Sequence, residues 1–321
     1  MANKGRGRQG GRATRADTPF TRAKASGKPV GRAAKKAAER EGSASAKSRP
    51  PRTPKSGGAD NRKGGADNRR SQTGPKGLGG DRVEGRQAVR ELLLSGRRRV
   101  REVVISSGMD QADILDDIID LADEMKVPIH EVSRARFDAS ARTTSAQGVY
   151  AEAQPLPEHD LADLIAPDDG SVPFLLALDG VTDPGNLGAL VRTAECAGVT
   201  GIVLPKHRAV HVTPTVTKSA AGAIEFVPMA LVGGLPAALS DMTKAGVWVV
   251  GLDEAGESRL DGLDLTQPTC LVLGAEGQGL GRLVRQRCDA IAAIPLLGKL
   301  NSLNVAAAGA VACFEVARQR S

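Results

Sequence analysis

Residues 81–153 alternate between apolar runs and stretches with helical spacing. Apolar side chains recur at intervals of three and four residues in two stretches, 83–96 and 111–126. Three short apolar runs have the length and composition of β-strands: 101–106, 127–132 and 148–153. The pattern predicts a small α/β domain, which we place at residues 81–154.

A proline- and acid-rich segment, 155–172, is predicted to link this domain to a second series of strands and helices. Strands are predicted at 174–179, 200–205, 227–232, 247–253, 269–277 and 290–296. Helices are predicted at 186–197, 213–226, 235–246 and 280–288, and an alanine-rich helix follows the last strand. Because these strands are apolar throughout and alternate with helices, they predict a parallel sheet covered on both faces, in a domain spanning 173–321.

The charge of the chain is divided unevenly. Residues 1–80 carry 21 Lys and Arg against 5 Asp and Glu, a net charge of +16, whereas the remainder carries −9. Larger apolar side chains are scarce in the first part, so burial there does not offset chain entropy of about 1–2 kcal/mol per residue. Residues 1–80 are therefore predicted to be a disordered basic arm. Such an arm most often binds a polyanion such as RNA, and the alternative is a solubilising linker.

Several functional classes receive no support from the sequence. No apolar run approaches the ~18 residues of a membrane helix, and the N-terminus lacks the apolar segment of a signal peptide. The four cysteines, Cys196, Cys270, Cys288 and Cys313, have no CxxC spacing and form no metal pattern with the histidines. We therefore expect a cytoplasmic protein with reduced thiols, no bound metal and no membrane partner.

Glycines cluster at the end of the strand predicted at 269–277. Gly274, Gly277 and Gly279 have the spacing GxxGxG, which reverses the dinucleotide-binding order. A true GxGxxG occurs at 5–10, but no strand precedes it, and the chain has no P-loop. A nucleotide-dependent oxidoreductase thus lacks its fingerprint. The three glycines instead allow a ligand to approach the backbone closely.

Three strand ends together resemble the three motifs of the SpoU (TrmH-like) family of RNA ribose 2′-O-methyltransferases. The matching residues are Asp183-Pro184-Gly185-Asn186 with Arg192, then Gly274-Ala275-Glu276-Gly277, then Ile294-Pro295 with Ser302-Leu303-Asn304. Their order and spacing match the family, and the resemblance covers 174–321. Residues 81–153 resemble the family's small L30e-like substrate-binding domain, although Ala146-Gln147-Gly148 replaces the usual His-Gln-Gly.

The resemblance implies a fold, a reaction and partners. The catalytic domain would contain a deep trefoil knot, bind S-adenosylmethionine (SAM) and form a homodimer whose active site takes residues from both subunits. The reaction would be 2′-O-methylation of a ribose in structured RNA, with 23S rRNA favoured over tRNA and guanosine favoured as the nucleotide. The alternative from another class is a non-catalytic RNA-binding dimer that acts in ribosome assembly. A degenerate relative of that kind would be expected to lose one or more motif residues.

The resemblance also assigns roles to individual residues. The cofactor pocket would be formed by Leu273, Gly274, Gly277, Ile294, Leu296 and Leu303. The catalytic group would comprise Asn186, Arg192, Glu276, Ser302 and Asn304. Ser302 and Asn304 would face the substrate ribose. Arg192 would activate the hydroxyl, either as a general base or by gripping phosphate and stabilising the alkoxide.

Local structure offers other roles for the same polar residues. Arg192 has an alternative as an exposed ion-pair partner of Glu195. Asn186 is expected to cap its own helix, and Asn301 or Ser302 is expected to cap the last helix. Glu276 is either a satisfied turn carboxylate or an anchor for Arg192. Lys218 is interpreted as a solvated helix residue that is able to touch phosphate.

Overall fold

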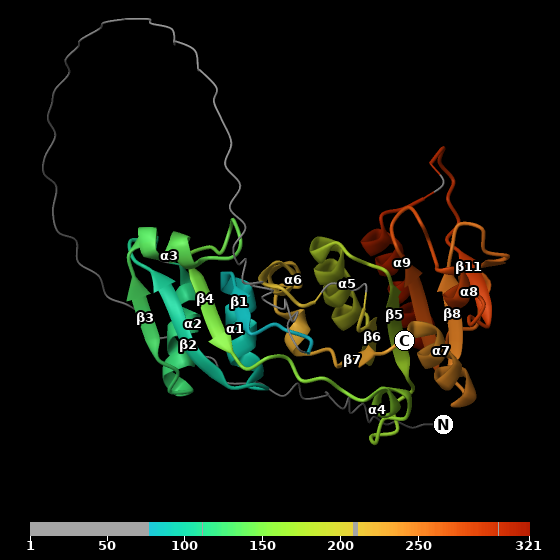
Figure 1. Cartoon of the computed structure of the whole chain (residues 1–321), viewed down its shortest axis with the longest axis horizontal. Helices are drawn as coiled ribbons and strands as arrows, with labels where there is room; N and C mark the ends of the chain where they lie inside the picture. The colour runs from blue at the N-terminus through green and yellow to red at the C-terminus, as the bar shows by residue number, and fades with distance from the viewer. Residues whose placement is uncertain (1–76, 111, 208–210, 301) are drawn as a thin grey trace, which may run out of the picture. The chain divides into compact units, whose positions relative to one another are not determined.

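The computed structural model describes residues 77–110, 112–207, 211–300 and 302–321, which contain two β-sheets (Figure 1). Most of the predicted arm, 1–80, lies outside these residues. Its last four residues do not. Leu78 is buried in the larger core, and the Gly80 N–H donates to the Val212 carbonyl over 2.8 Å. The folded part of the chain therefore begins before residue 81.

The first sheet has four strands in the order β1-β4-β2-β3. The strands are β1 (Arg82–Glu84), β2 (Val100–Ser106), β3 (Ile129–Val132) and β4 (Val149–Ala153). The helices are α1 (Arg86–Ser95), α2 (Asp113–Glu124) and α3 (Arg134–Ser140). Strand β4 is antiparallel to both β1 and β2, whereas β2 and β3 are parallel. The stretch 83–96 was predicted to be helical throughout, but Gly85, at φ 104°, separates β1 from α1.

The second sheet has seven strands in the order β7-β6-β5-β10-β8-β11-β9, and every pairing in it is parallel. The strands are β5 (Phe174–Asp179), β6 (Gly201–Pro205), β7 (Met229–Val232), β8 (Trp248–Leu252), β9 (Ser258–Arg259), β10 (Thr269–Gly274) and β11 (Ala290–Ala293). The predicted parallel sheet is confirmed. The short strand β9 was not predicted.

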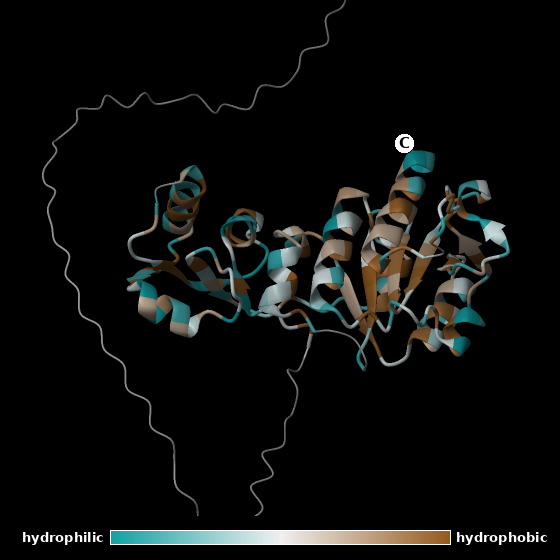
Figure 2. Cartoon of the chain, turned by 90° about the horizontal axis from the view of Figure 1, so that it is seen from above, coloured by the Kyte–Doolittle hydropathy of each residue, from teal (hydrophilic) through white to brown (hydrophobic). Residues whose placement is uncertain are grey.

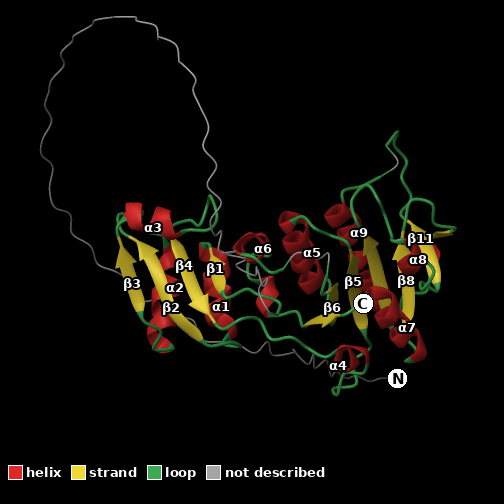
Figure 3. Cartoon of the chain, viewed as in Figure 1, coloured by secondary structure: helices red, strands yellow, loops and turns green. Residues whose placement is uncertain are grey.

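Helices and short 3-10 turns connect these strands (Figure 3). The α-helices are α4 (Leu161–Ile165), α5 (Pro184–Cys196), α6 (Pro214–Ser219), α7 (Leu235–Lys244), α8 (Arg282–Arg285) and α9 (Val305–Arg320), and the turns are η1 (Ala223–Glu225) and η2 (Leu260–Gly262). The helix predicted at 213–226 is divided into α6 and η1 because Ala221 and Gly222 have positive φ angles of 50° and 90°. Helix α4 lies within the predicted linker, 155–172, and buries Leu164 against the sheet.

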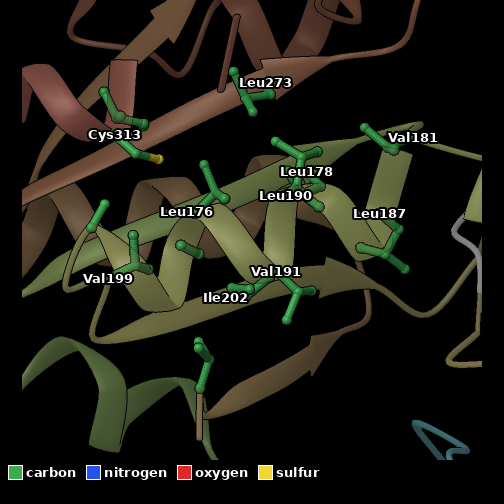
Figure 4. Packing of buried hydrophobic residues seen from close by; sticks show 14 of the residues in the cluster. Leu176, Leu178, Val181, Leu187, Leu190, Val191, Val199, Ile202, Leu273 and Cys313 are labelled. Carbon is green, nitrogen blue, oxygen red and sulfur yellow. The ribbon is translucent and has the colours of Figure 1, made fainter. Parts of the chain in front are cut away.

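Both faces of the larger sheet are covered, as the apolar strands require. Along β5, Leu176 and Leu178 face a core shared with α5, α6 and α9, whereas Leu175 and Ala177 face a core shared with α4, α7 and α8. Figure 2 shows the strands in brown beside helices that carry teal residues as well. Figure 4 shows the first core, where α5, β5 and β10 meet α9 at Cys313.

The last helix packs closely on α5, and this contact positions both helix N-termini at one edge of the sheet. Gly309 lies against the side chain of Leu190, and a methyl group at position 309 would overlap it. Among the described residues no helix is long and apolar enough to cross a membrane.

Candidate active site

A cavity of about 560 Å³ lies at the carboxyl ends of β8, β10 and β11. Open α/β sheets bind their ligands at such an edge. The six residues predicted to bind the cofactor all line this cavity: Leu273, Gly274, Gly277, Ile294, Leu296 and Leu303. Three of the predicted catalytic residues line it as well: Glu276, Ser302 and Asn304. Segments far apart in the sequence therefore share one pocket.

The glycine-rich wall of the cavity is a tight turn between Ala275 and Gly279. The Gly279 N–H donates to the Ala275 carbonyl over 2.9 Å, and the Ala275 N–H donates back to Gly279 over 3.1 Å. Gly277 and Gly279 have φ angles of 76° and 65°, a region that side chains disfavour. A methyl group on Gly274 would overlap the backbone where the turn returns. The backbone of this turn is consequently open to the cavity.

A chain of hydrogen bonds joins the three motifs. The Asn304 Oδ1 accepts from the N–H groups of Ala306 and Ala307 at the start of α9, over 2.9 and 3.4 Å. The Asn304 Nδ2 donates to the Asn186 Oδ1 over 3.1 Å, and the Asn186 Nδ2 donates to Glu276 over 3.3 Å. Each amide group has its oxygen and nitrogen assigned by these partners. The chain runs from the positive end of a helix to a carboxylate, so each bond in it strengthens the next.

Two helix caps differ from the sequence predictions. Helix α9 begins at Val305 and is capped by Asn304, not by Ser302, and Asn301 lies outside the described residues. Helix α5 is capped by Asp183, whose side chain accepts from the Asn186 N–H over 2.7 Å. Pro184 is suited to the first helical position, so the cap is the residue before it, Asp183, three residues earlier than the predicted Asn186. Asn186 then lies within the first turn of α5, where its side chain is free to reach Glu276 and Asn304.

Arg192 does not line the cavity of its own chain. It lies exposed on α5, and no hydrogen bond or ion pair joins its side chain to Glu195, to Glu276 or to any other described residue. The surface ion pair with Glu195 is therefore not formed. Glu276 contacts Asn186 instead of anchoring Arg192. Of the five predicted catalytic residues, Arg192 alone stands apart from the others.

Two acidic residues in the cavity wall were not predicted. Asp253 and Glu254 follow β8 directly and line the cavity. The Asp253 carboxylate pairs with the Arg285 guanidinium over 2.8 Å and accepts from the Ala255 N–H over 2.9 Å. Their position after a buried strand was the available signal, because parallel strands end at the same edge of the sheet.

Comparison with known proteins places the chain in a family. The SpoU rRNA Methylase family matches residues 173–314, and the domain described as RNA 2′-O ribose methyltransferase substrate binding matches residues 82–159. A 23S rRNA (guanosine-2′-O-)-methyltransferase, RlmB of Pseudomonas aeruginosa, is 40% identical over 244 residues, 75% of this chain and 97% of that protein. This chain belongs to the SpoU rRNA methylase family. The RlmB protein of Shewanella oneidensis is 41% identical over 243 residues, 75% of this chain and 98% of that protein.

Solved structures of SpoU methyltransferases share the fold. The SpoU methyltransferase AviRb from Streptomyces viridochromogenes, in complex with the cofactor AdoMet, superimposes with a TM-score of 0.62 at 26% identity. The match covers 74% of this chain and 89% of AviRb. In the present chain, the substrate-binding match spans the four-stranded sheet and the SpoU rRNA Methylase match spans the seven-stranded sheet.

Proposed function

We propose that this chain transfers a methyl group from SAM to the ribose 2′-oxygen of a guanosine in 23S rRNA. The observation that carries the proposal is a cavity lined by the second and third SpoU motifs, to which the first motif is joined by the Asn304–Asn186–Glu276 hydrogen bonds. The names of the RlmB relatives, similar over nearly their whole length, supply the substrate. Because that substrate is ribosomal RNA, we place the protein in the cytoplasm.

The cavity fits the cofactor in size and chemistry. Pockets for ligands of this size enclose about 300–1,000 Å³ and combine apolar walls with a few polar groups. Leu273, Ile294 and Leu303 offer apolar surface for the adenine, and the open turn around Gly277 offers backbone groups. When bound, SAM supplies a methyl group already activated by its sulfonium charge. What is left to the protein is to orient the ribose and to manage one proton.

The residues at the mouth of the cavity suit that task. Ser302 and Asn304 are exposed there, and Asn304 is held from both ends of its side chain. In proteins an arginine guanidinium stays protonated. Arg192 therefore acts in this proposal as a clamp on a substrate phosphate that also stabilises the developing alkoxide.

The proposal includes a homodimer with shared active sites. Helix α9 exposes an apolar stripe of Ala307, Val311 and Phe314, spaced by four and three residues along one face. Covering this stripe with a second copy buries it. Arg192, which is outside its own cavity, is then available to the cavity of the partner. The dimer explains why the catalytic set is incomplete in one chain.

The proposal also includes a trefoil knot, supported by the path of the chain around β11. Strand β11 lies between β8 and β9, although β8 and β9 follow each other in sequence. The loop between β8 and β9 passes close to β11. Its Gly256 is so near that an added methyl group there would lie 2.5 Å from the Ala292 carbonyl carbon. Beyond β9 the chain is fastened to α9, where Gln319 donates to the Leu263 carbonyl over 3.1 Å. These contacts are those expected of a chain end threaded through the loop.

The test is transfer of tritium from labelled SAM to 23S rRNA transcripts, with tRNA as a second substrate. Wild-type protein should label 23S rRNA on a guanosine ribose, and Arg192→Ala should lose at least about 100-fold in kcat while it keeps its affinity for SAM. Lys244→Ala removes an exposed cation that pairs with Asp241 on α7, outside the cavity lining, and it should remain fully active. No labelling of any RNA, with no binding of SAM, would favour a non-catalytic RNA-binding dimer.

Mixing two variants, each impaired at one catalytic residue, tests the shared site. Arg192→Ala and Asn304→Ala subunits, exchanged at equal concentration, form half of all dimers as mixed dimers, and each mixed dimer has one intact site. About a quarter of wild-type activity should return if the site takes residues from both subunits. If each site is built within one subunit, the mixture stays as impaired as the variants alone.

A further inference from the structure

One buried ion pair joins the smaller sheet's domain to the larger one. The Arg98 guanidinium donates to both carboxylate oxygens of Glu225, over 2.7 and 2.6 Å. The side chains of Arg98 and Glu225 are 3% and 1% exposed. Arg98 lies between α1 and β2, and Glu225 ends the 3-10 turn η1. The two residues therefore belong to different domains of the one compact unit that includes residues 69–321.

The same guanidinium also holds both chain segments that connect the domains. The Arg98 Nη1 donates to the Gly80 carbonyl over 2.7 Å and to the Gln154 carbonyl over 2.6 Å. Gly80 lies just before β1, where the chain enters the small domain, and Gln154 lies just after β4, where the chain leaves it. Nearly all the donors of Arg98 are thus used to fix the junction.

Neighbouring contacts complete this junction on η1 and α6. The Arg97 Nη1 donates to the Phe226 carbonyl over 3.1 Å, and the Arg97 guanidinium lies 5.6 Å from the Phe226 ring centre. Gly222 packs so closely on Glu91 of α1 that a methyl group there would overlap the side chain. The Lys218 ammonium donates to the Ser145 hydroxyl of the small domain. Lys218 is thus a junction residue rather than a purely solvated one.

A buried ion pair is a poor way to gain stability, because desolvation offsets its attraction and apolar residues serve as well. The pair instead restricts the two domains to one relative orientation, because a bidentate ion pair tolerates little rotation. Methyl transfer requires that geometry, because an RNA held by the small domain must present its 2′-oxygen to a cavity in the other domain. A misplacement of about 1 Å at the reacting atoms costs about 100-fold in rate.

We propose that Arg98 and Glu225 are positioning residues that fix the RNA-binding domain in register with the methyl-transfer cavity. The inference rests on the proposed function and adds to it a pair outside the three motifs. It requires that disruption of the pair harms the methylation of an RNA long enough to contact both domains. Methylation of a short hairpin that contains the target nucleotide but does not reach the small domain should be affected much less. The affinity for SAM should be almost unchanged.

The test compares Glu225→Gln, which keeps the shape and removes the charge, with Asp241→Asn. Asp241 makes an exposed ion pair with Lys244 within α7 and provides a matched control. For Glu225→Gln we expect kcat/KM to fall about tenfold on the long RNA and less than about threefold on the hairpin, with SAM affinity within about twofold. Amide hydrogen exchange in 97–100 and 222–226 should accelerate at least about tenfold, while exchange in α7 stays unchanged.

Unchanged kcat/KM on the long RNA would overturn the inference, as would an equal fall on both RNAs together with weaker SAM binding. If Glu225→Gln does not fold, Arg98→Lys carries the same test, because lysine keeps the charge but makes no bidentate pair. Absence of methyl transfer by the wild-type protein would refute the proposed function without testing the role of the ion pair at the junction. Hydrogen exchange in the variants still reports whether the pair fixes the junction.

Discussion

Replacement of Asn304 separates its two roles, because alanine and aspartate remove different bonds. Asn304→Ala loses the cap on α9, worth about 1 kcal/mol, and the exposed bond to Asn186, worth about 0.5 kcal/mol. A loss of about 1.5 kcal/mol should lower the Tm by about 4 °C in a folded unit of this size. Asn304→Asp keeps an oxygen for the cap, and its charge is favourable at a helix N-terminus. Its Tm should therefore stay within about 2 °C of the wild-type value.

Activity should not follow stability in this pair of variants. The carboxylate of Asn304→Asp has no N–H to donate to Asn186, so the connection between α9 and Glu276 is broken in both variants. We expect kcat to fall at least about tenfold in each, because the ribose-facing groups are no longer held. The measurements are thermal unfolding by circular dichroism and tritium transfer from SAM to 23S rRNA.

A cap far from the site provides the control. Ser133 caps α3 in the small domain, where its hydroxyl accepts from the Arg136 N–H over 3.4 Å. Ser133→Ala should lower the free energy of unfolding by up to about 1 kcal/mol and leave kcat unchanged. Wild-type kcat in Asn304→Asp would refute the reasoning, because it would show that the residue serves only as a cap.

Three further outcomes are expected. Deletion of 1–76 should weaken RNA binding and reduce the slope of log K against log salt by about 0.7 for each phosphate that the segment neutralises, because this segment carries the positive excess; an unchanged slope in a filter-binding titration would contradict it. Gly274→Ala should destabilise the fold by about 2 kcal/mol and abolish SAM binding in calorimetry, whereas Gly298→Ala, with no atom within 4 Å of the added methyl, should do neither. Ellman's reagent at pH 8 should modify one thiol per folded chain, Cys196, because burial raises the pKa of all four thiols but only Cys196 is exposed to the reagent; rapid modification of two or more thiols would count against the packing.

Much of the larger domain was predictable because its strands are buried on both faces. The run 174–179 is apolar at every position but the last, and β5 occupies these same residues. The cavity residues were predicted from the resemblance to the SpoU family, and they meet because parallel strands end at one edge: Gly274 ends β10 and Ile294 directly follows β11. Short elements were missed because a few residues show no detectable hydrophobic pattern, as in β9 with its two residues.

The helix caps show where local rules were insufficient. Asn301 and Ser302 were the two predicted caps of α9, and the actual cap, Asn304, was not predicted, because propensity alone does not choose among these polar residues. The choice depends on Asn186, whose side chain fixes the amide of Asn304 from a segment more than 100 residues earlier. In the same way, nothing near Glu225 in the sequence indicates its partner, because Arg98 lies 127 residues away. The partners of these side chains are set by contacts between distant segments, and those contacts are known only once the fold is known.

Two sets of polar contacts position the reacting groups, one within the cavity and one between the two domains. The Asn304–Asn186–Glu276 bonds are exposed, so each is weak and their value lies in holding groups within the cavity. The Arg98–Glu225 pair is buried, so its value lies in excluding other orientations of the RNA-binding domain. If the small domain were free to rotate, a rigid cavity would gain little, since the 2′-oxygen would seldom reach it. If the cavity were loose, a rigid junction would deliver the ribose to groups that are not in place. The two sets should therefore be non-additive in kcat on the long RNA, and Glu225→Gln should cost less in an Asn304→Ala background than in the wild type.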